Sequence, residues 1–168
     1  RSVEDRKNQI LTGVEWKKLL SQYPVVVADK RKYYIESNRS HYNHAHHSDG
    51  LDVVEQIIGE KYSEYSAAFT KVCNRTWAHM FNMFVMRRDL FDQYCEWMFS
   101  ILEEIENRVD ISNYDRYEAR IYGFVSEILL DVWLEANNIN YKEQNVSFME
   151  PQNWLKKGGL FLKRKFFK

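Results

Sequence analysis

The segment LTGVEWKKLLSQYPVVVAD, residues 11–29, places a helix directly before a buried strand. Thr12 and Glu15 have the spacing of a capping box, in which each side chain accepts a hydrogen bond from the other residue's backbone N–H. Pro24 prevents the helix from continuing, and the β-branched run at 25–29 has the pattern of a buried strand. This order of elements is typical of an α/β fold.

Three later stretches have the apolar spacing of helices. Residues 49–74 predict one or two helices, and residues 89–109 predict the clearest one, since apolar side chains recur there every three or four positions. A further helix is predicted over 115–137, where Asp115 and Glu118 have capping spacing.

The remaining segments predict two more strands and a long loop. The nearly continuous apolar run WAHMFNMFVMRR, residues 77–88, predicts a core strand, and YKEQNVSFME, residues 141–150, alternates weakly. Residues 30–48 are polar and aromatic with no clean period, which favours a long loop, and such loops are often functional. Together these patterns predict a mixed sheet flanked by helices.

The composition limits the classes of function. The 168 residues suffice for one domain, and a formal net charge of zero argues against a nucleic-acid-binding protein. The two cysteines are too few for a disulfide framework, which indicates a reduced, cytoplasmic setting. No apolar run has the length of a membrane span, and the first residues do not resemble a signal peptide. Because the chain does not begin with Met, we expect it to be part of a longer protein.

Four of the five histidines lie in HYNHAHH, residues 41–47. His44 and His46 would share a side in an extended segment, and His41 and His44 only in a helix. No cysteine is near, and zinc sites normally take ligands from two separate elements. We therefore predict no metal site here, and expect the loop to hydrogen-bond a polar ligand or to be ordered by its own contacts.

Charged groups offer two further candidate sites, each with a purely structural alternative. Lys30, Arg31 and Lys32 follow the buried strand, where α/β sheets often bind ligands, and guanidinium groups suit phosphate; the alternative is a solvated basic turn. Glu118, Arg120 and Glu127 lie on the helix predicted over 115–137, where capping and surface exposure explain them equally well. The sequence contains no glycine-rich phosphate loop, GxSxG or HExxH motif.

The last residues, NWLKKGGLFLKRKFFK at 153–168, interleave six cations with large apolar side chains. This composition is typical of a segment lying on an anionic membrane surface, although a helix docked on the protein would look similar. We treat residues 1–150 as the domain and residues 151–168 as a basic aromatic tail.

Several ordered blocks resemble a bacterial glycosyltransferase family of capsular and exopolysaccharide gene clusters, long catalogued as a domain of unknown function. The blocks are KRKYYIES (30–37), HYNHAHH (41–47), the stretch from 51 to 112, and YEARIYGFVSEILLDVWLEANN (117–138). Family members also carry an HYRRY-type block, which this sequence lacks. The resemblance therefore implies the helix-rich C-terminal portion of a GT-A-like domain.

The resemblance implies transfer of a sugar from a nucleotide-sugar donor to a glycan or lipid-linked glycan acceptor, peripherally at the inner face of the cell membrane. A divalent cation, Mn or Mg, is compatible with this activity, but no Asp-x-Asp motif is visible. The acceptor-side candidates are Glu118 and Arg120, with Glu127 behind them; one of the carboxylates would act as the base. The implied substrate contacts are Lys30 and Arg31 to phosphate, and His41, Tyr42, His44, His79 and Asn82 to sugar groups, the last two from a central strand.

Two alternatives to this enzyme remain open at the level of sequence. One is a non-catalytic membrane-associated binding or scaffolding module, and the other is a zinc protein built on the histidine segment. Liposome binding with and without the tail would test the first alternative, and metal analysis would test the second.

Overall fold

Helices and short strands alternate along the computed structural model, which describes residues 3–46 and 49–150. The helices are α1 (Val3–Lys7), α2 (Gly13–Gln22), α3 (Asn38–Ala45), α4 (Asp49–Lys61), α5 (Ser66–Asn74), α6 (Arg88–Arg108) and α7 (Ile121–Ala136). Short 3-10 turns η1 (Ser63–Tyr65) and η2 (Glu118–Arg120) precede α5 and α7. The strands are β1 (Val25–Ala28), β2 (Arg31–Lys32), β3 (Trp77–Ala78), β4 (Phe84–Met86) and β5 (Tyr141–Gln144).

The main sheet is mixed and has the order β4-β1-β5. Strand β1 runs antiparallel to β4, with Val26 opposite Val85, and parallel to β5, with Val26 opposite Lys142. All four residues of β1 are buried, as the β-branched run predicted. A second, two-stranded sheet pairs β2 with β3 and sets Arg31 opposite Ala78.

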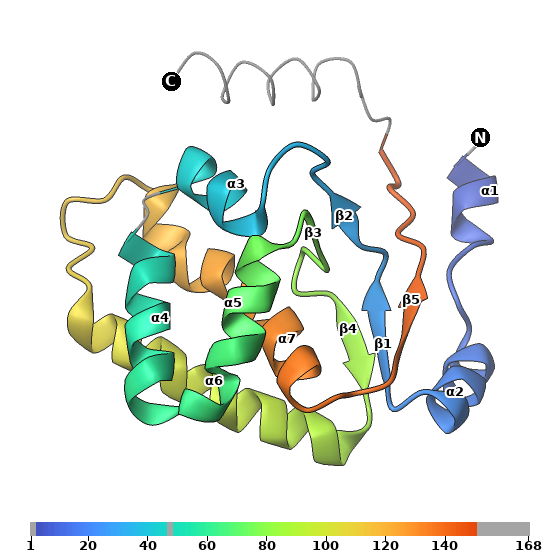
Figure 1. Ribbon diagram of the computed structural model, residues 1–168. Helices are drawn as coiled ribbons and strands as arrows, with labels where there is room; N and C mark the ends of the chain where they lie inside the picture. Colours follow the sequence, from blue (N-terminus) through green and yellow to red (C-terminus); the bar gives the residue numbers. More distant parts are fainter. Residues whose placement is uncertain (1–2, 47–48, 151–168) are drawn as a thin grey trace.

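The hydrophobic core lies among helices α4 to α7 and the sheet. In Figure 1, α3 to α7 lie to the left of the three-stranded sheet, and α1 and α2 lie to its right. Helix α7 is buried along most of its length, and the rings of Tyr94 and Trp133 meet edge to face at 5.5 Å where α6 packs against α7. The prediction of a mixed sheet flanked by helices is confirmed.

Local sequence signals explain where two of the helices begin. The capping box of α2 is present: the Thr12 backbone N–H donates to Glu15 at 2.8 Å, and the Glu15 N–H donates to the Thr12 hydroxyl at 3.4 Å. Asp115 accepts the backbone N–H groups of Tyr117 and Glu118 at 2.7 and 2.8 Å, which orders the turn before α7. The Glu118 backbone N–H is therefore part of the turn that Asp115 orders before α7.

The predicted loop over residues 30–48 is wrong, because the segment contains β2 and α3. Ser37 caps α3 by accepting the Ser40 N–H at 3.1 Å. The buried Asn38 amide then donates to the carbonyls of Val72 and Trp77, each at 2.8 Å. Since polar contacts of this kind anchor α3, its sequence shows no apolar period.

The single strand predicted over residues 77–88 is also wrong. The backbone turns at Phe81 and Asn82, whose φ angles of 81° and 50° lie in the left-handed region. Such angles are uncommon for residues other than glycine and interrupt a strand. Strands β3 and β4 consequently belong to different sheets.

The predicted basic aromatic tail, residues 151–168, lies outside the described residues. Within residues 3–46 and 49–150, no helix is both long enough and apolar enough to cross a membrane.

Candidate functional site

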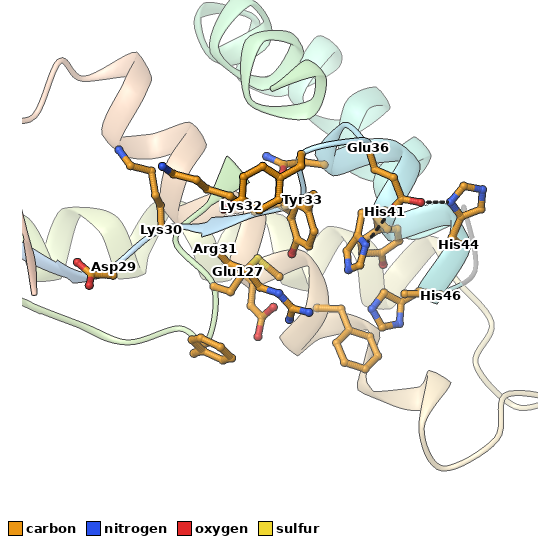
Figure 2. A pocket seen from close by; sticks show the side chains of 18 of the residues that line it. Asp29, Lys30, Arg31, Lys32, Tyr33, Glu36, His41, His44, His46 and Glu127 are labelled. Atoms are coloured by element: carbon orange, nitrogen blue, oxygen red, sulfur yellow. Dashed lines mark hydrogen bonds and ion pairs between the residues drawn. The ribbon is translucent and has the colours of Figure 1, made fainter. Parts of the chain in front are cut away.

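A cavity of about 890 Å³ is bordered by the segment from β2 to α3, by α7 and by the chain after β5. Its volume lies in the range of ligand pockets. The predicted residues that line it are Lys30, Arg31, His41, Tyr42, His44 and Glu127. The segment 30–46 thus supplies one wall and α7 the facing one (Figure 2).

A buried carboxylate organises the histidine side of this cavity. The Glu36 carboxylate accepts hydrogen bonds from Nδ1 of His41 and Nδ1 of His44, each at 3.0 Å, and its side chain is almost fully buried (Figure 2). Because α3 is helical, His41 and His44 lie on one face and reach the same acid. Glu36 therefore fixes the orientation of both rings at the cavity wall.

Tyr33 connects the histidines to the basic turn. Its ring stacks on His41 with centroids 3.9 Å apart, and the Arg31 guanidinium lies 5.4 Å from the centre of the Tyr33 ring. Burial raises the pKa of Tyr33 to about 12, so its hydroxyl keeps its proton at neutral pH. Within the described residues Arg31 forms no salt bridge, which leaves its cation available to a ligand.

Glu127 is the acid of α7 that faces the cavity. Burial raises the pKa of its carboxyl group, against the opposing effects of a hydrogen bond from the Phe81 backbone N–H and of the Arg31 and Arg120 charges. Figure 2 shows Glu127 beside Arg31, below Tyr33. A carboxyl group with a raised pKa in a pocket is a candidate for proton transfer.

Aromatic rings close the end of the cavity near the start of α7. The His46 ring stacks on Phe124 with centroids 3.8 Å apart and on Tyr117 at 5.6 Å. Arg120 lies 5.3 Å from the centre of the Phe124 ring and is not among the residues that line the cavity. Tyr42 is buried beneath the wall against Gly50, where an added Cβ would meet its hydroxyl at 2.2 Å.

His79 does not reach the cavity. It is fully buried after β3, outside any strand, and its Nδ1 donates to Asp131 at 2.6 Å. Its backbone N–H donates to the other oxygen of Asp131 at 2.8 Å, and Arg75 contacts that oxygen at 2.6 Å. His79 therefore belongs to a core ion network and is not among the residues that line the cavity.

Asn82 and Glu118 also lie outside the cavity lining. Asn82 occupies the left-handed turn rather than a central strand, and its amide donates to the Gly123 carbonyl at 3.1 Å. Of the three predicted catalytic candidates, the structure brings only Glu127 to the cavity wall.

No group of three or more metal-binding side chains is present among residues 3–46 and 49–150. The cavity acid Glu36 is held by two imidazole N–H groups, an arrangement that orients the histidines rather than leaving them to converge on an ion. The described residues thus do not fit a Mn or Mg site on their own.

Three site residues escaped the sequence reasoning: Tyr33, Glu36 and His46. Each lies in a segment without period, and each depends on α3 being helical. A signal was available in Ser37, which precedes three residues that can start a helix and has a residue type preferred at N-caps. That signal predicts the helix, and the helix places Glu36 one turn from His41.

Comparisons with known proteins agree with this architecture. A family model described as a domain of unknown function, DUF4422, matches residues 1–138. Among solved structures, the apo structure of the bifunctional glycosyltransferase WbbM is similar over 76% of this chain, with 26% sequence identity and a TM-score of 0.72. The chain spans 24% of that WbbM chain. The search of curated proteins gives no match.

Proposed function

The chain belongs to the DUF4422 family, and on that premise we propose that it forms part of a glycosyltransferase that binds a nucleotide sugar in the cavity beside α3. The similarity to a bifunctional glycosyltransferase supports this class of reaction. The observation that carries the proposal is that Arg31, a cation without a salt-bridge partner in the described chain, stands beside the carboxyl group of Glu127 in one cavity.

Arg31 is suited to the phosphate groups of the donor. A guanidinium group can form two parallel hydrogen bonds with phosphate oxygens, and stacking on Tyr33 limits its freedom before the ligand arrives. Lys30 and Lys32 lie at the same wall of the cavity and add positive charge. His41 and His44, oriented by Glu36, present imidazole groups that suit sugar hydroxyls.

Glu127 is suited to the role of the base that deprotonates the acceptor hydroxyl. Its raised pKa, caused by burial, makes its carboxylate a stronger proton acceptor than that of an ordinary glutamate. In the proposed step, the acceptor oxygen attacks the anomeric carbon, its proton passes to Glu127, and the nucleotide leaves with the electron pair of the broken bond. Arg31 stabilises the negative charge that develops on the leaving phosphate.

The rim of the cavity suits a glycan acceptor. Tyr34 is 81% exposed and adopts a left-handed backbone with φ of 60°, a conformation that is uncommon for residues other than glycine and that recurs at ligand sites. Exposed aromatic rings at a pocket mouth offer flat apolar faces for sugar rings. We propose a capsular or exopolysaccharide acceptor, bound at the cell membrane with the help of the tail at 151–168.

The test combines protection from heat with a transfer assay. Nucleotide sugars, or their nucleoside diphosphates, should raise the midpoint of thermal unfolding of the chain. Glu127→Gln should retain this shift, because Arg31 is still present to bind phosphate. Its rate of sugar release from the donor should fall by about 10²–10⁴-fold, because the base is removed. Absence of a shift with every common donor would contradict the proposal. A shift without any transfer or donor hydrolysis would favour a non-catalytic binding module.

A further inference from the structure

A network of charged side chains connects the protein core with the cavity. It begins at Arg75 and Asp131, which are 2.6 Å apart, and continues from Asp131 to His79 Nδ1 at 2.6 Å. It ends at Glu143, whose Oε1 lies 3.5 Å from His79 Nε2 and 2.7 Å from Lys30 Nζ. Lys30 lines the cavity, so this network connects the fully buried His79 to the proposed phosphate site.

At the buried end of this network, the carboxyl group of Asp131 is ionised. Burial alone would raise the pKa of Asp131, but the hydrogen bond from His79 and the nearby Arg75 charge outweigh it and lower that pKa. Asp131 is therefore ionised at neutral pH and accepts hydrogen bonds only. His79 must carry a hydrogen on Nδ1, which leaves Nε2, facing Glu143, as the position where it can gain a second one.

At the outer end of this network, Oε1 of Glu143 lies between two possible hydrogen-bond donors, Lys30 and His79. Burial alone would raise the pKa of Glu143, but the ion pair with Lys30 and the smaller effect of the His79 contact outweigh it and lower that pKa, so Glu143 is ionised as well. Its Oε1 is bonded to Lys30, while Nε2 of His79 faces the same oxygen at the outer limit of a hydrogen bond. A neutral His79 would point a lone pair at this carboxylate, whereas a protonated His79 would donate to it.

We propose that an anionic ligand in the cavity draws Lys30 away from Glu143 and that His79 then takes up one proton at Nε2 and becomes the hydrogen-bond donor to Glu143. This inference rests on the proposed function, because it assigns Lys30 to the phosphate of the ligand. The proton comes from the solvent, Lys30 keeps its charge, and the new imidazolium replaces it as the counter-charge of Glu143. His79 acts through Glu143 and Lys30 as a positioning residue, without touching the ligand.

The groups around His79 permit this exchange. Asp131 and Glu135 from α7 and Glu143 from β5 supply negative charge, while Arg75 after α5 and Lys30 after β1 supply positive charge. The Tyr141 ring packs edge to face on His79 at 5.0 Å, and burial raises the pKa of this phenol, which therefore stays neutral. Removal of the Lys30 cation from this set leaves Glu143 without its salt-bridge partner, and the His79 imidazole is the group that then faces its carboxylate.

Titration calorimetry in two buffers of different ionisation enthalpy tests the exchange, since the difference in heat gives the number of protons taken up. The probes are UDP, GDP and pyrophosphate, used at the same pH throughout. The wild type should take up a measurable fraction of a proton, at most about one per anion bound. Glu143→Gln should bind the same probe with that uptake abolished, because no carboxylate remains to pair with an imidazolium.

Two further variants separate the positioning role from a general loss of structure. Lys30→Met should bind the probe roughly tenfold more weakly or worse, and without proton uptake. Lys142→Met, an exposed lysine on the same strand as Glu143, should behave as the wild type in both measurements. Glu143 and Lys30 are partly exposed, so these variants are expected to fold even where a substitution of His79 does not.

The outcomes distinguish the two proposals. If the wild type binds none of the three probes, the proposed function fails and the inference fails with it. If the wild type binds but shows the same proton uptake as Glu143→Gln, the inference is overturned and the proposed function stands. Uptake that is present in the wild type and Lys142→Met, and absent in Glu143→Gln and Lys30→Met, supports the exchange.

Discussion

Two histidine–carboxylate clusters in this chain have the same chemistry and opposite surroundings. At the cavity wall, Glu36 holds His41 and His44, whose side chains are 19% and 38% exposed; in the core, Asp131 holds His79, which is fully buried. The core cluster also contains Arg75, packed 3.5 Å above the ring of Trp77, whereas among the described residues no arginine forms an ion pair with Glu36. An imidazole hydrogen-bonded to a carboxylate can therefore serve ligand binding where the rest of its ring faces a cavity, and serves the fold where the ring is enclosed in the core.

The largest effect should come from breaking the core cluster. Asp131→Asn removes the carboxylate 2.6 Å from the largely buried Arg75 and leaves it with the more distant Glu135, at 3.9 Å. We expect the free energy of unfolding to fall by about 3–5 kcal/mol. Urea denaturation followed by circular dichroism measures this loss. Asp92→Asn, which breaks an exposed ion pair with Arg88, is the control and should cost about 0–1 kcal/mol. Equal effects of the two substitutions would show that the core network contributes no more than a surface pair.

A smaller loss is expected when the wall cluster is broken. Glu36→Gln keeps the shape of the side chain but can accept through only one oxygen, so one of the two histidines loses its partner. We expect a destabilisation of about 1–3 kcal/mol, together with weaker ligand binding. Glu55→Gln, at an exposed ion pair with Arg39, serves as the control. Stability reduced as much as in Asp131→Asn, with binding unchanged, would mean that the wall cluster is structural too.

The packing of Gly50 in α4 against Tyr42 can be tested by substitution. Gly50→Ala would place a Cβ 2.2 Å from the Tyr42 hydroxyl and 3.2 Å from Ile121, so the wall must shift; we expect a destabilisation of about 1–3 kcal/mol. Gly59→Ala in the same helix has open space around the new Cβ and should stabilise the protein by about 0.5–1 kcal/mol. The two melting temperatures should therefore move in opposite directions, and a shift in the same direction would contradict this packing.

The smallest effect on stability should come from Glu127. A carboxyl group whose pKa is raised on folding stabilises the fold at pH values below its unfolded pKa and loses that contribution as the pH rises through its folded pKa. Glu127→Gln should therefore be slightly more stable than the wild type at neutral pH, and this advantage should vanish on acidification below about pH 4. Melting curves between pH 3 and pH 8 provide the measurement. A variant that is less stable at neutral pH would indicate that Glu127 holds the fold.

Local signals in the sequence were sufficient for much of the fold. The Thr12–Glu15 capping box, the β-branched run of β1 and the apolar spacing of α6 all act within a few residues, and the structure contains each of them. The helix α3 was missed because its anchor is the polar Asn38, and the strand at 77–88 was wrong because two left-handed residues interrupt it.

Candidate residues that are neighbours in the sequence could be grouped from the sequence alone, whereas contacts between distant residues could not. The basic turn and the histidine segment lie together along the cavity, since only a few residues separate them. The contact between His79 and Asp131 could not be predicted, because the two residues lie 52 positions apart and no local pattern connects them. Glu127 ranked last among the acids by sequence, and only the packing of α7 against the cavity distinguishes it from Glu118.

Binding of a nucleotide sugar by wild-type protein and by Arg31→Ala tests the central claim most directly. Calorimetric titration with a panel of nucleotide sugars should find at least one that binds the wild type. Arg31→Ala should bind it about 10–100-fold more weakly, because a charged hydrogen-bond donor to phosphate is lost. Arg88→Ala, which removes an exposed arginine on α6, should bind as the wild type does. Equal affinity of wild type and Arg31→Ala, or no binding of any donor, would contradict the assignment of this cavity.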